Sequence, residues 1–219
     1  MEGASRSARV HFRLECVSCA PVESEQYDDH GDEAYIGRVG VVRMPCQRIC
    51  AARIRLEPLM ELHAPSLFPL LRDETLWEFT DEAPPKSLRA LCARHRRLES
   101  RRSADGTQLW LNWAIALHGG AVMGVVQATV PANRASIAIA YVLGRPYWAH
   151  GYAREAVSAM MAGIEESLGV VEFLATVDSR NVRSGLLLAR LGFCAVDASD
   201  PQNLLWRRPI PRSLPPSKT

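Results

Sequence analysis

The spacing of apolar residues becomes regular near Ala52 and predicts ordered elements from there onwards. Apolar and charged residues alternate between Ile54 and Pro58, which is the period of a half-buried strand. Leucines at helical spacing between Glu61 and Arg72 predict a helix that Pro65 and Pro69 keep short or irregular. The regular part of the chain therefore opens with one strand and one short helix.

A second helix is expected after a loop that contains prolines and aromatic residues. The loop runs from Asp73 to Lys86 and includes the pair Pro84-Pro85. Ser87 suits the N-cap of a helix that reaches about Arg102 and has one apolar face. Arginines crowd the other faces, and such a surface suits an acidic partner such as ribosomal RNA or, more commonly, plain solvent. We expect no specific nucleic-acid partner.

A run of strands follows and ends in alternating strands and helices. The glycines of His118-Gly119-Gly120 suit a hairpin between the first two strands. The remaining predicted elements are strands at Leu109–Leu117, Val122–Val130 and Ser136–Leu143, a helix at Arg154–Leu168, a strand at Val170–Val177 and a helix that stops at Leu191.

This order of elements indicates an α/β protein with a mixed sheet, since antiparallel strands precede a β-α-β-α segment. The strand that ends at Leu143 runs into a glycine-bearing turn, Gly144 to Ala153, and then into a helix. Such a turn aims the free N–H groups of the helix, and the positive end of its dipole, at whatever lies above it. The result is an anion site, most often one for phosphate.

Length and composition fit one domain with extensions. The chain has 219 residues, of which 47% are apolar and 23% charged, as in ordinary globular proteins. Its net charge of +2 favours neither nucleic acid nor a membrane surface, and no apolar stretch is long enough to cross a bilayer. The N-terminus lacks the apolar segment of a secretory signal, so we expect a cytoplasmic protein. The predicted domain spans residues 51–208, between a disordered leader or mis-assigned start at 1–50 and a disordered tail at 209–219.

Four of the six cysteines lie in the N-terminal segment, as Cys16-Val-Ser-Cys19 and Cys46-Gln-Arg-Ile-Cys50. Four thiolates can hold a structural zinc ion. The spacing departs from that of zinc ribbons and no knuckle glycines are present, so we favour the disordered leader and expect no metal. Cys92 and Cys194 lie in apolar surroundings and are predicted to be buried small hydrophobes.

Two blocks of sequence carry a family signal. Tyr147 to Ala153 matches the loop Tyr-Trp-Gly-Lys-Gly-Tyr-Ala except at Ala149 and His150. Asn181-Val-Arg-Ser184, followed by Leu191-Gly192-Phe193, matches Asn-x-x-Ser and Leu-Gly-Phe. With their separation and the order of elements, the blocks resemble the GNAT-type acetyltransferases, in the branch similar to ribosomal-protein N-terminal alanine acetyltransferases. The resemblance covers about residues 54–206 and implies a fold in which antiparallel strands precede β-α-β-α around a splayed acyl-CoA cleft.

By this resemblance the loop binds the pyrophosphate of acetyl-CoA, the co-substrate. Gly151 lacks a Cβ, so the pyrophosphate can approach the backbone closely, and the neighbouring N–H groups form a concave donor nest. Ala149 in place of glycine suits the nest only with φ below zero, and His150 replaces a cationic residue. The implied contacts are Trp148, Ala149, His150, Gly151, Tyr152 and Ala153.

The resemblance also implies residues along the pantetheine arm. The backbone of Tyr141, Val142 and Leu143 would pair with the arm, and an N–H there would polarise the thioester carbonyl. Asn181 matches the family's pantetheine-contacting asparagine and equally suits a helix cap. Ser184 matches a position near the thiol from which it could protonate the leaving thiolate, although a plain helix-surface serine is an equal interpretation.

The general base is not evident, because many relatives carry a glutamate where this chain has Ala138, and some carry a tyrosine acid where it has Leu188. The candidate bases are Glu78 and Asp81 in the loop after the first helix, with Asp73 behind them, although ordinary exposed acids are the commoner interpretation of such loop residues. An α-amine has a pKa of about 7.7–8.0 and a lysine about 10.4, so without a strong base a lysine costs about 3 kcal/mol more to deprotonate. This favours an acceptor amine of modest pKa.

We therefore predict an acetyl-CoA-dependent N-acetyltransferase that moves the acetyl group directly to a primary amine, such as a protein N-terminal α-amine. A small-molecule acetyltransferase, acting on an amino acid, amino sugar or antibiotic, is one alternative, since fold and loop do not identify the acceptor. A CoA-binding module without chemistry is another. The acceptor groove is expected between residues 73–86 and the strands near Trp110 and Trp113. Monomer and homodimer both remain open.

Overall fold

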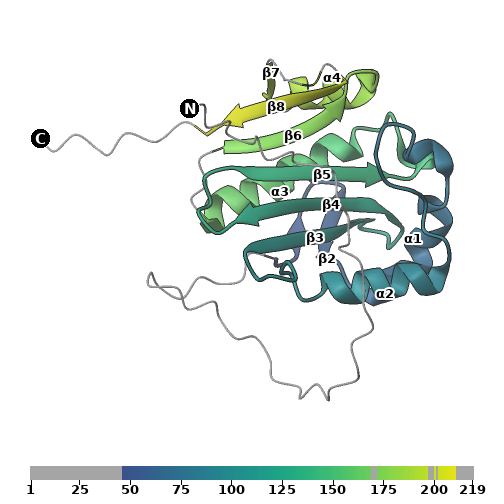
Figure 1. The fold of residues 1–219 in the computed structure, drawn as a ribbon. Coiled ribbons are helices and arrows are strands. Elements are labelled where there is room, and N and C mark those ends of the chain that lie inside the picture. Colours follow the sequence, from purple (N-terminus) through teal and green to yellow (C-terminus); the bar gives the residue numbers. More distant parts are fainter. Residues whose placement is uncertain (1–45, 169–171, 197–199, 201, 211–219) are drawn as a thin grey trace, which may run out of the picture.

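The structure, a computed structural model, describes residues 46–168, 172–196, 200 and 202–210. These residues form one eight-stranded sheet with helices packed against it (Figure 1). The predicted α/β fold with a mixed sheet is confirmed.

The strand order in the sheet is β1-β2-β3-β4-β5-β6-β8-β7. Neighbouring strands are antiparallel except for β5 and β6, which are parallel and lie at the centre of the site described below. The strands are β1 Ile49–Cys50, β2 Ile54–Pro58, β3 Gln108–Leu117, β4 Val122–Pro131, β5 Ile137–Leu143, β6 Glu172–Asp178, β7 Cys194–Val196 and β8 Asn203–Pro209.

Four α-helices accompany the sheet in the described ranges, and short 3₁₀ turns precede α1, follow α1 and precede α3. Ser87 caps α2 as predicted, since its side chain accepts a hydrogen bond from the Ala90 N–H at 3.1 Å. The helix ends earlier than the predicted Arg102, because Arg101 takes a left-handed conformation with φ 54°. The helices are α1 Ala64–Leu71, α2 Leu88–Leu98, α3 Tyr152–Leu168 and α4 Val182–Arg190, and the 3₁₀ turns are Glu61–His63, Glu74–Leu76 and Arg145–Tyr147.

Two apolar cores lie on opposite faces of the sheet. Trp113 and Ala114 are neighbours on β3 and belong to different cores, because successive side chains of a strand point to opposite faces. The first core packs α3 against the sheet through Met160 and Ile164, and the second packs α1 and α2 against the other face. Each core is therefore built on the alternation that predicted the strands.

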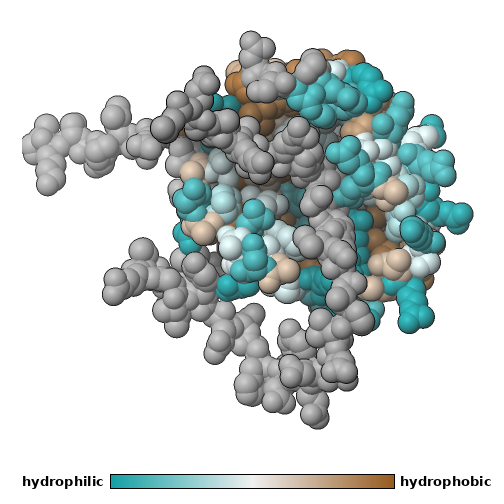
Figure 2. All heavy atoms as spheres, in the orientation of Figure 1, coloured by the Kyte–Doolittle hydropathy of each residue, from teal (hydrophilic) through white to brown (hydrophobic). Residues whose placement is uncertain are grey.

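Helix α4 buries only one of its faces. Leu188 is fully buried in the α3 core, so the position where some relatives carry a tyrosine acid is here part of the packing. On the other face Val182 and Leu186 are 65% and 55% exposed. Figure 2 shows hydrophobic surface at the top of the molecule, over the α4 and β7 end of the sheet.

Three strands were absent from the prediction. β1 and β7 span two and three residues, too short for a readable period. β8 is a full strand, but none of its seven residues is fully buried and it carries two arginines, so its pattern lacks a clear apolar face. Pairing with β6 along its whole length, from Glu172↔Pro209 to Asp178↔Asn203, is what makes it a strand.

The described fold begins before residue 51. Cys46 is 3% exposed, and the carbonyl of Gln47 accepts a hydrogen bond from Trp113 Nε1 at 2.9 Å. Burial raises the pKa of the Cys46 thiol to about 11, against the opposing influence of Arg101, so this thiol is a poor metal ligand. Cys16 and Cys19 lie outside the described residues. Within these, no group of three or more metal-binding side chains occurs and no helix is long and apolar enough to cross a membrane.

The two cysteines that were predicted to be buried differ in their exposure. Cys92 is half-buried, but Cys194 is exposed on β7, so its predicted burial was wrong. That strand lies at the edge of the sheet, where apolar neighbours in the sequence do not ensure that a side chain is buried.

The arginine face of α2 is partly paired with carboxylates. Arg94 and Arg96 form ion pairs with Glu82 and Glu61 at 3.2 and 2.7 Å.

Candidate active site

The sheet opens between β5 and β6. The two parallel strands pair at only two positions, Ile137 with Phe173 and Ala138 with Leu174. Beyond them β5 stays with β4 as far as Leu143, while β6 continues with β8. The far half of β5 therefore has no strand on its β6 side in the described part of the chain. The splayed strands expected from the family resemblance are present.

Trp148 joins the start of the following loop to the end of β5. Its indole Nε1 donates a hydrogen bond to the Leu143 carbonyl at 2.8 Å. The Arg183 guanidinium of α4 lies 4.0 Å from the ring centroid, within the range of a cation–π contact. Trp148 is thus occupied with protein contacts, and the Leu143 carbonyl already has a donor.

The loop before α3 has the shape of an anion nest. The N–H groups of Ala149 to Ala153 make no hydrogen bond to any described residue. Ala149 and Gly151 both have positive φ, 64° and 80°. The condition set for alanine at this position, a φ below zero, is therefore not met, and the left-handed conformation that the loop needs there is costly for a residue with a Cβ. His150 Nδ1 lies 2.6 Å from the Trp148 carbonyl and so carries the hydrogen of that bond.

Arg53, on the turn between β1 and β2, braces this loop from outside. Its Nη1 donates to the His150 carbonyl at 3.0 Å, and its Nε to Glu155 in the first turn of α3 at 2.8 Å. The guanidinium also lies over the Tyr152 ring, 4.7 Å from the centroid. Burial acts to raise the pKa of Glu155, but the hydrogen bonds from Arg53 hold it below its ordinary value. The Arg53 guanidinium thus places a positive charge beside Gly151, in a loop where His150 stands in place of the cationic residue of the family pattern.

Sequence reasoning missed Arg53. It precedes His150 by 97 positions, and its own segment has the pattern of an ordinary strand edge. Nothing local marks it as part of the loop, and only the packing of the first hairpin against α3 brings the two together.

A hydroxyl pair lies across the opening. Tyr141 Oη of β5 and Ser184 Oγ of α4 are 2.6 Å apart, and either can be the donor. Asn181 Oδ1 accepts a hydrogen bond from the Ser184 N–H at 3.1 Å, so the cap predicted for Asn181 is present. Burial raises the pKa of Tyr141 to about 12, with Ser184 opposing it, so the phenol keeps its proton at neutral pH. The prediction used only the backbone of Tyr141 and missed this side chain.

A small hollow, with a cavity volume of about 20 Å³ and open to solvent, lies on the α1 and α2 face beside β5. Its walls are mostly apolar and include Trp77, Leu91 and Val125. Ala140, Tyr141 and Val142 belong to its lining, so it adjoins the unpaired half of β5. We call it the acceptor hollow. Three polar residues line it: Arg94, His95 and Gln127.

The candidate base Glu78 does not line the acceptor hollow. It is exposed, and it lies near Arg180, whose pKa Asp178 and, more weakly, Glu78 raise. Asp73 caps the Glu74–Leu76 turn by accepting the Thr75 N–H at 3.0 Å. The structure brings Tyr141, Ser184 and Asn181 together, and Glu78 forms no hydrogen bond with any of these three residues.

Comparison with known proteins agrees with this geometry. Residues 53–194 match the family described as acetyltransferase (GNAT) domain, whereas no curated protein matches the chain. Among solved structures, a putative acetyltransferase from T. thermophilus is 25% identical, with TM-score 0.60 over 74% of this chain and 88% of its own. A putative ribosomal-protein-serine acetyltransferase from Vibrio cholerae is 17% identical, with TM-score 0.63 over 77% and 100% of the two chains.

The ribosomal L7/L12 α-N-protein acetyltransferase RimL, solved in complex with coenzyme A, is 18% identical, with TM-score 0.62 over 75% of this chain and 98% of that one. These likenesses agree with the eight-stranded sheet and its opening between β5 and β6. The family match covers more than half of the sequence. The chain therefore belongs to the GNAT family of acetyltransferases and is an acyltransferase.

Proposed function

We propose that this enzyme transfers the acetyl group of acetyl-CoA directly to a primary amine, and that the amine is the N-terminal α-amine of a protein or peptide. The observation that carries the donor half is the anion nest at Ala149–Ala153, which lies next to the unpaired edge of β5. Free N–H groups and the α3 dipole suit a pyrophosphate, and the adjacent edge suits the amides of pantetheine.

The chemistry follows from where the thioester would lie. With pantetheine along β5, a backbone N–H near Tyr141 or Val142 would polarise the thioester carbonyl. The amine would attack that carbon while the C–S bond breaks and its electron pair moves to sulfur. The Tyr141–Ser184 hydroxyl pair, 2.6 Å apart, would supply the proton that the leaving thiolate needs. Asn181 would hold Ser184 at the start of α4.

The acceptor follows from what the site lacks. Among the described residues no carboxylate lines the acceptor hollow, so the amine must lose its proton without a strong base. An α-amine does so near neutral pH, whereas a lysine carries about 3 kcal/mol of extra cost. Two structural neighbours, RimL and the Vibrio cholerae protein, are described as ribosomal-protein acetyltransferases, which supports a ribosomal-protein terminus as the class of acceptor.

The first test is calorimetric binding of acetyl-CoA to the full chain and to Gly151→Trp. Gly151 has φ 80°, so any side chain is strained there and would fill the nest. Gly119→Trp is the matched control, because nothing lies within 4 Å of a Cβ at that hairpin position. We expect micromolar binding that only the Gly151 variant loses, and no binding in the unmodified chain would refute the donor assignment.

The second test measures release of free CoA thiol with three kinds of acceptor. These are peptides with a free α-amine and no lysine, the same peptides with an acetylated terminus and one lysine, and amino sugars or aminoglycosides. We expect turnover of the first kind, with the added mass on the terminal residue. Turnover confined to the third kind would make the enzyme a small-molecule acetyltransferase.

A further inference from the structure

His95 is a buried polar residue in the wall of the acceptor hollow. It lies four residues after Leu91 and three before Leu98, so it shares their face of α2, which packs on the sheet. Its side chain is 2% exposed, yet it lines the hollow together with Ala140 and Val142. Alternate residues of a strand share a face, so Ala138 belongs to the same face of β5 as Ala140 and Val142.

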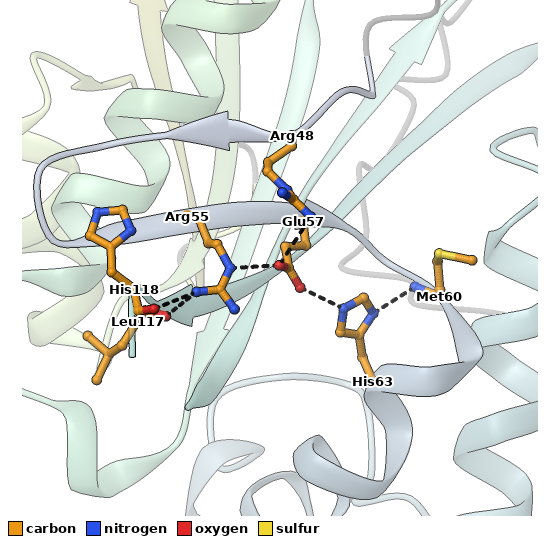
Figure 3. Close-up of polar contacts among 7 residues, drawn as sticks. All are labelled: Arg48, Arg55, Glu57, Met60, His63, Leu117 and His118. Atoms are coloured by element: carbon orange, nitrogen blue, oxygen red, sulfur yellow. Dashed lines mark hydrogen bonds and ion pairs between the residues drawn. The ribbon is translucent and has the colours of Figure 1, made fainter. Parts of the chain in front are cut away.

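The hydrogen bonds around His95 determine which ring nitrogen carries the proton. The ring is hydrogen-bonded to the Met60 backbone, and Nδ1 has no partner among the described residues. The Met60 N–H already donates a hydrogen bond to His63 Nδ1 at 3.0 Å (Figure 3). The Met60 group that bonds the His95 ring is therefore the carbonyl. His63 is held in turn by Glu57, 3.2 Å from its other nitrogen. His95 therefore donates through Nε2, and Nδ1 presents a buried lone pair.

A buried hydrogen-bond acceptor that has no donor lowers the stability of the fold, and native proteins rarely leave such an atom without a hydrogen bond. The described residues supply no donor to Nδ1, and His95 lines the hollow, so we infer that a group entering the hollow supplies the donor. Tyr141 and Val142 line the same space, and the proposed thioester lies along their strand. An N–H group that reaches Nδ1 would thus lie in the same hollow as the carbonyl that it attacks.

We propose that His95 Nδ1 binds the acceptor of the reaction by accepting a hydrogen bond from its amino group, which directs the nitrogen lone pair toward the thioester. This inference rests on the proposed function and deepens it, because it names a residue that positions the acceptor. It also accounts for Ala138, since the group that contacts the amine comes from α2 instead of from the strand.

The surroundings of the His95 ring determine whether it only accepts a hydrogen bond from the amine or also removes a proton from it. Burial, with Arg94 and His63 nearby, lowers the pKa of His95 to about 4, against the smaller opposing influence of the Met60 hydrogen bond and Glu61. The ring is therefore neutral throughout the working range of an α-amine transferase and is too weakly basic to hold a proton. The proton of the amine leaves through water, and His95 only orients the nitrogen.

Two substitutions separate this role from a structural one. In His95→Gln the amide reaches the position of Nε2 and can keep the Met60 bond, but nothing remains at Nδ1. In His95→Asn an oxygen can take the place of Nδ1, while the Met60 bond is lost. If His95 positions the acceptor, Gln is the more harmful for catalysis, and if it only supports the fold, Asn is the more harmful.

The assay uses the full chain, acetyl-CoA and a hexapeptide with N-terminal alanine and no lysine. We expect His95→Gln to raise the KM for the peptide at least tenfold and His95→Asn to raise it less than threefold, with acetyl-CoA affinity by calorimetry within twofold of the unmodified enzyme. His118→Gln, at the β3–β4 turn, is the control and should change neither. A peptide KM that is unchanged in the Gln variant, or raised more in the Asn variant, would overturn the inference.

Failure of the proposed function is recognised separately. If the unmodified enzyme binds acetyl-CoA but acetylates no peptide, the acceptor class is wrong, and the role of His95 is decided with the amine that the acceptor panel finds to be acetylated, by nitrogen NMR of histidine-labelled protein. The Nδ1 resonance should move when that amine is added to the CoA complex, and should not move when its N-acetylated product is added. No movement with that amine would overturn the role of His95 as well.

Discussion

At the scale of single residues, the site depends on a pair of hydroxyl groups that can donate a proton. Tyr141 and Ser184 share one hydrogen bond of 2.6 Å, and burial keeps the phenol protonated. Ser184 was an even choice between a catalytic and a surface serine from the sequence. Its contact with the half-buried Tyr141 across the strand opening favours the catalytic interpretation, which we propose.

Removing either hydroxyl should slow the chemical step. We expect Ser184→Ala and Tyr141→Phe each to lower kcat about 10- to 100-fold with little change in the KM for acetyl-CoA, since general acid catalysis contributes in this range. The double variant should be no slower than the worse single one, because the two groups act as a unit. Steady-state kinetics with urea unfolding as a folding control checks this, and losses that multiply would contradict the shared role.

Ala149 is the residue at which the loop departs from its favoured geometry. A φ of 64° destabilises the folded state by about 1–2 kcal/mol for a residue with a Cβ. Glycine avoids this cost, but part of the gain is offset because glycine loses more backbone entropy on folding. We expect Ala149→Gly to raise the free energy of unfolding by roughly 0.5–1 kcal/mol and to bind acetyl-CoA at least as tightly. Arg134→Gly, at φ 52° in a distant turn, should stabilise similarly without changing acetyl-CoA binding. Weaker binding by Ala149→Gly would show that the alanine methyl contributes a contact.

At the scale of elements, the anion nest is held by a hairpin that precedes it by about a hundred residues. The β1–β2 turn contributes Arg53, which bonds both the His150 carbonyl and Glu155 of α3. The order of strands and helices was predictable from period and turn residues, and so was the place of the nest after β5. The brace was not, because it joins elements that no local pattern relates.

Breaking the brace should affect the donor substrate specifically. We expect Arg53→Ala to raise the KM for acetyl-CoA roughly tenfold while kcat changes less than threefold, since charged hydrogen bonds are the stronger kind. Arg207→Ala is a matched control: its ion pair with Glu172 has side-chain exposures of 50% and 17%, against 50% and 16% for Arg53 and Glu155. Equal effects of the two variants on acetyl-CoA would argue against a specific brace.

At the scale of the whole molecule, stability should depend on pH through His95. Its folded pKa of about 4 lies below the ordinary 6.5, so the unfolded chain binds more protons as pH falls between these values. Arg94 and His63 lower the pKa of His95 in the same direction as burial, whereas Glu61 opposes them. The stabilisation is complete above pH 6.5 and is lost toward pH 4.

We expect the free energy of unfolding in urea to fall by roughly 1 kcal/mol between pH 7 and pH 5.5, before most carboxylates titrate. His95→Gln removes the titrating group, so that variant should show a flatter dependence over the same interval. An unmodified enzyme whose stability is constant between these two values would contradict the buried, neutral imidazole.

The sequence by itself determined the fold class, the order of the main elements and the family, because alternation, helical spacing and two short motifs are local properties of the chain. It also located the nest, since a turn between a strand and a helix exposes N–H groups wherever it occurs. Tertiary structure alone decided the β8 pairing, the Tyr141–Ser184 contact, the Arg53 brace and the lone pair of His95. Each of these depends on burial or on contacts between distant segments, and neither quantity is written in the pattern of a single segment.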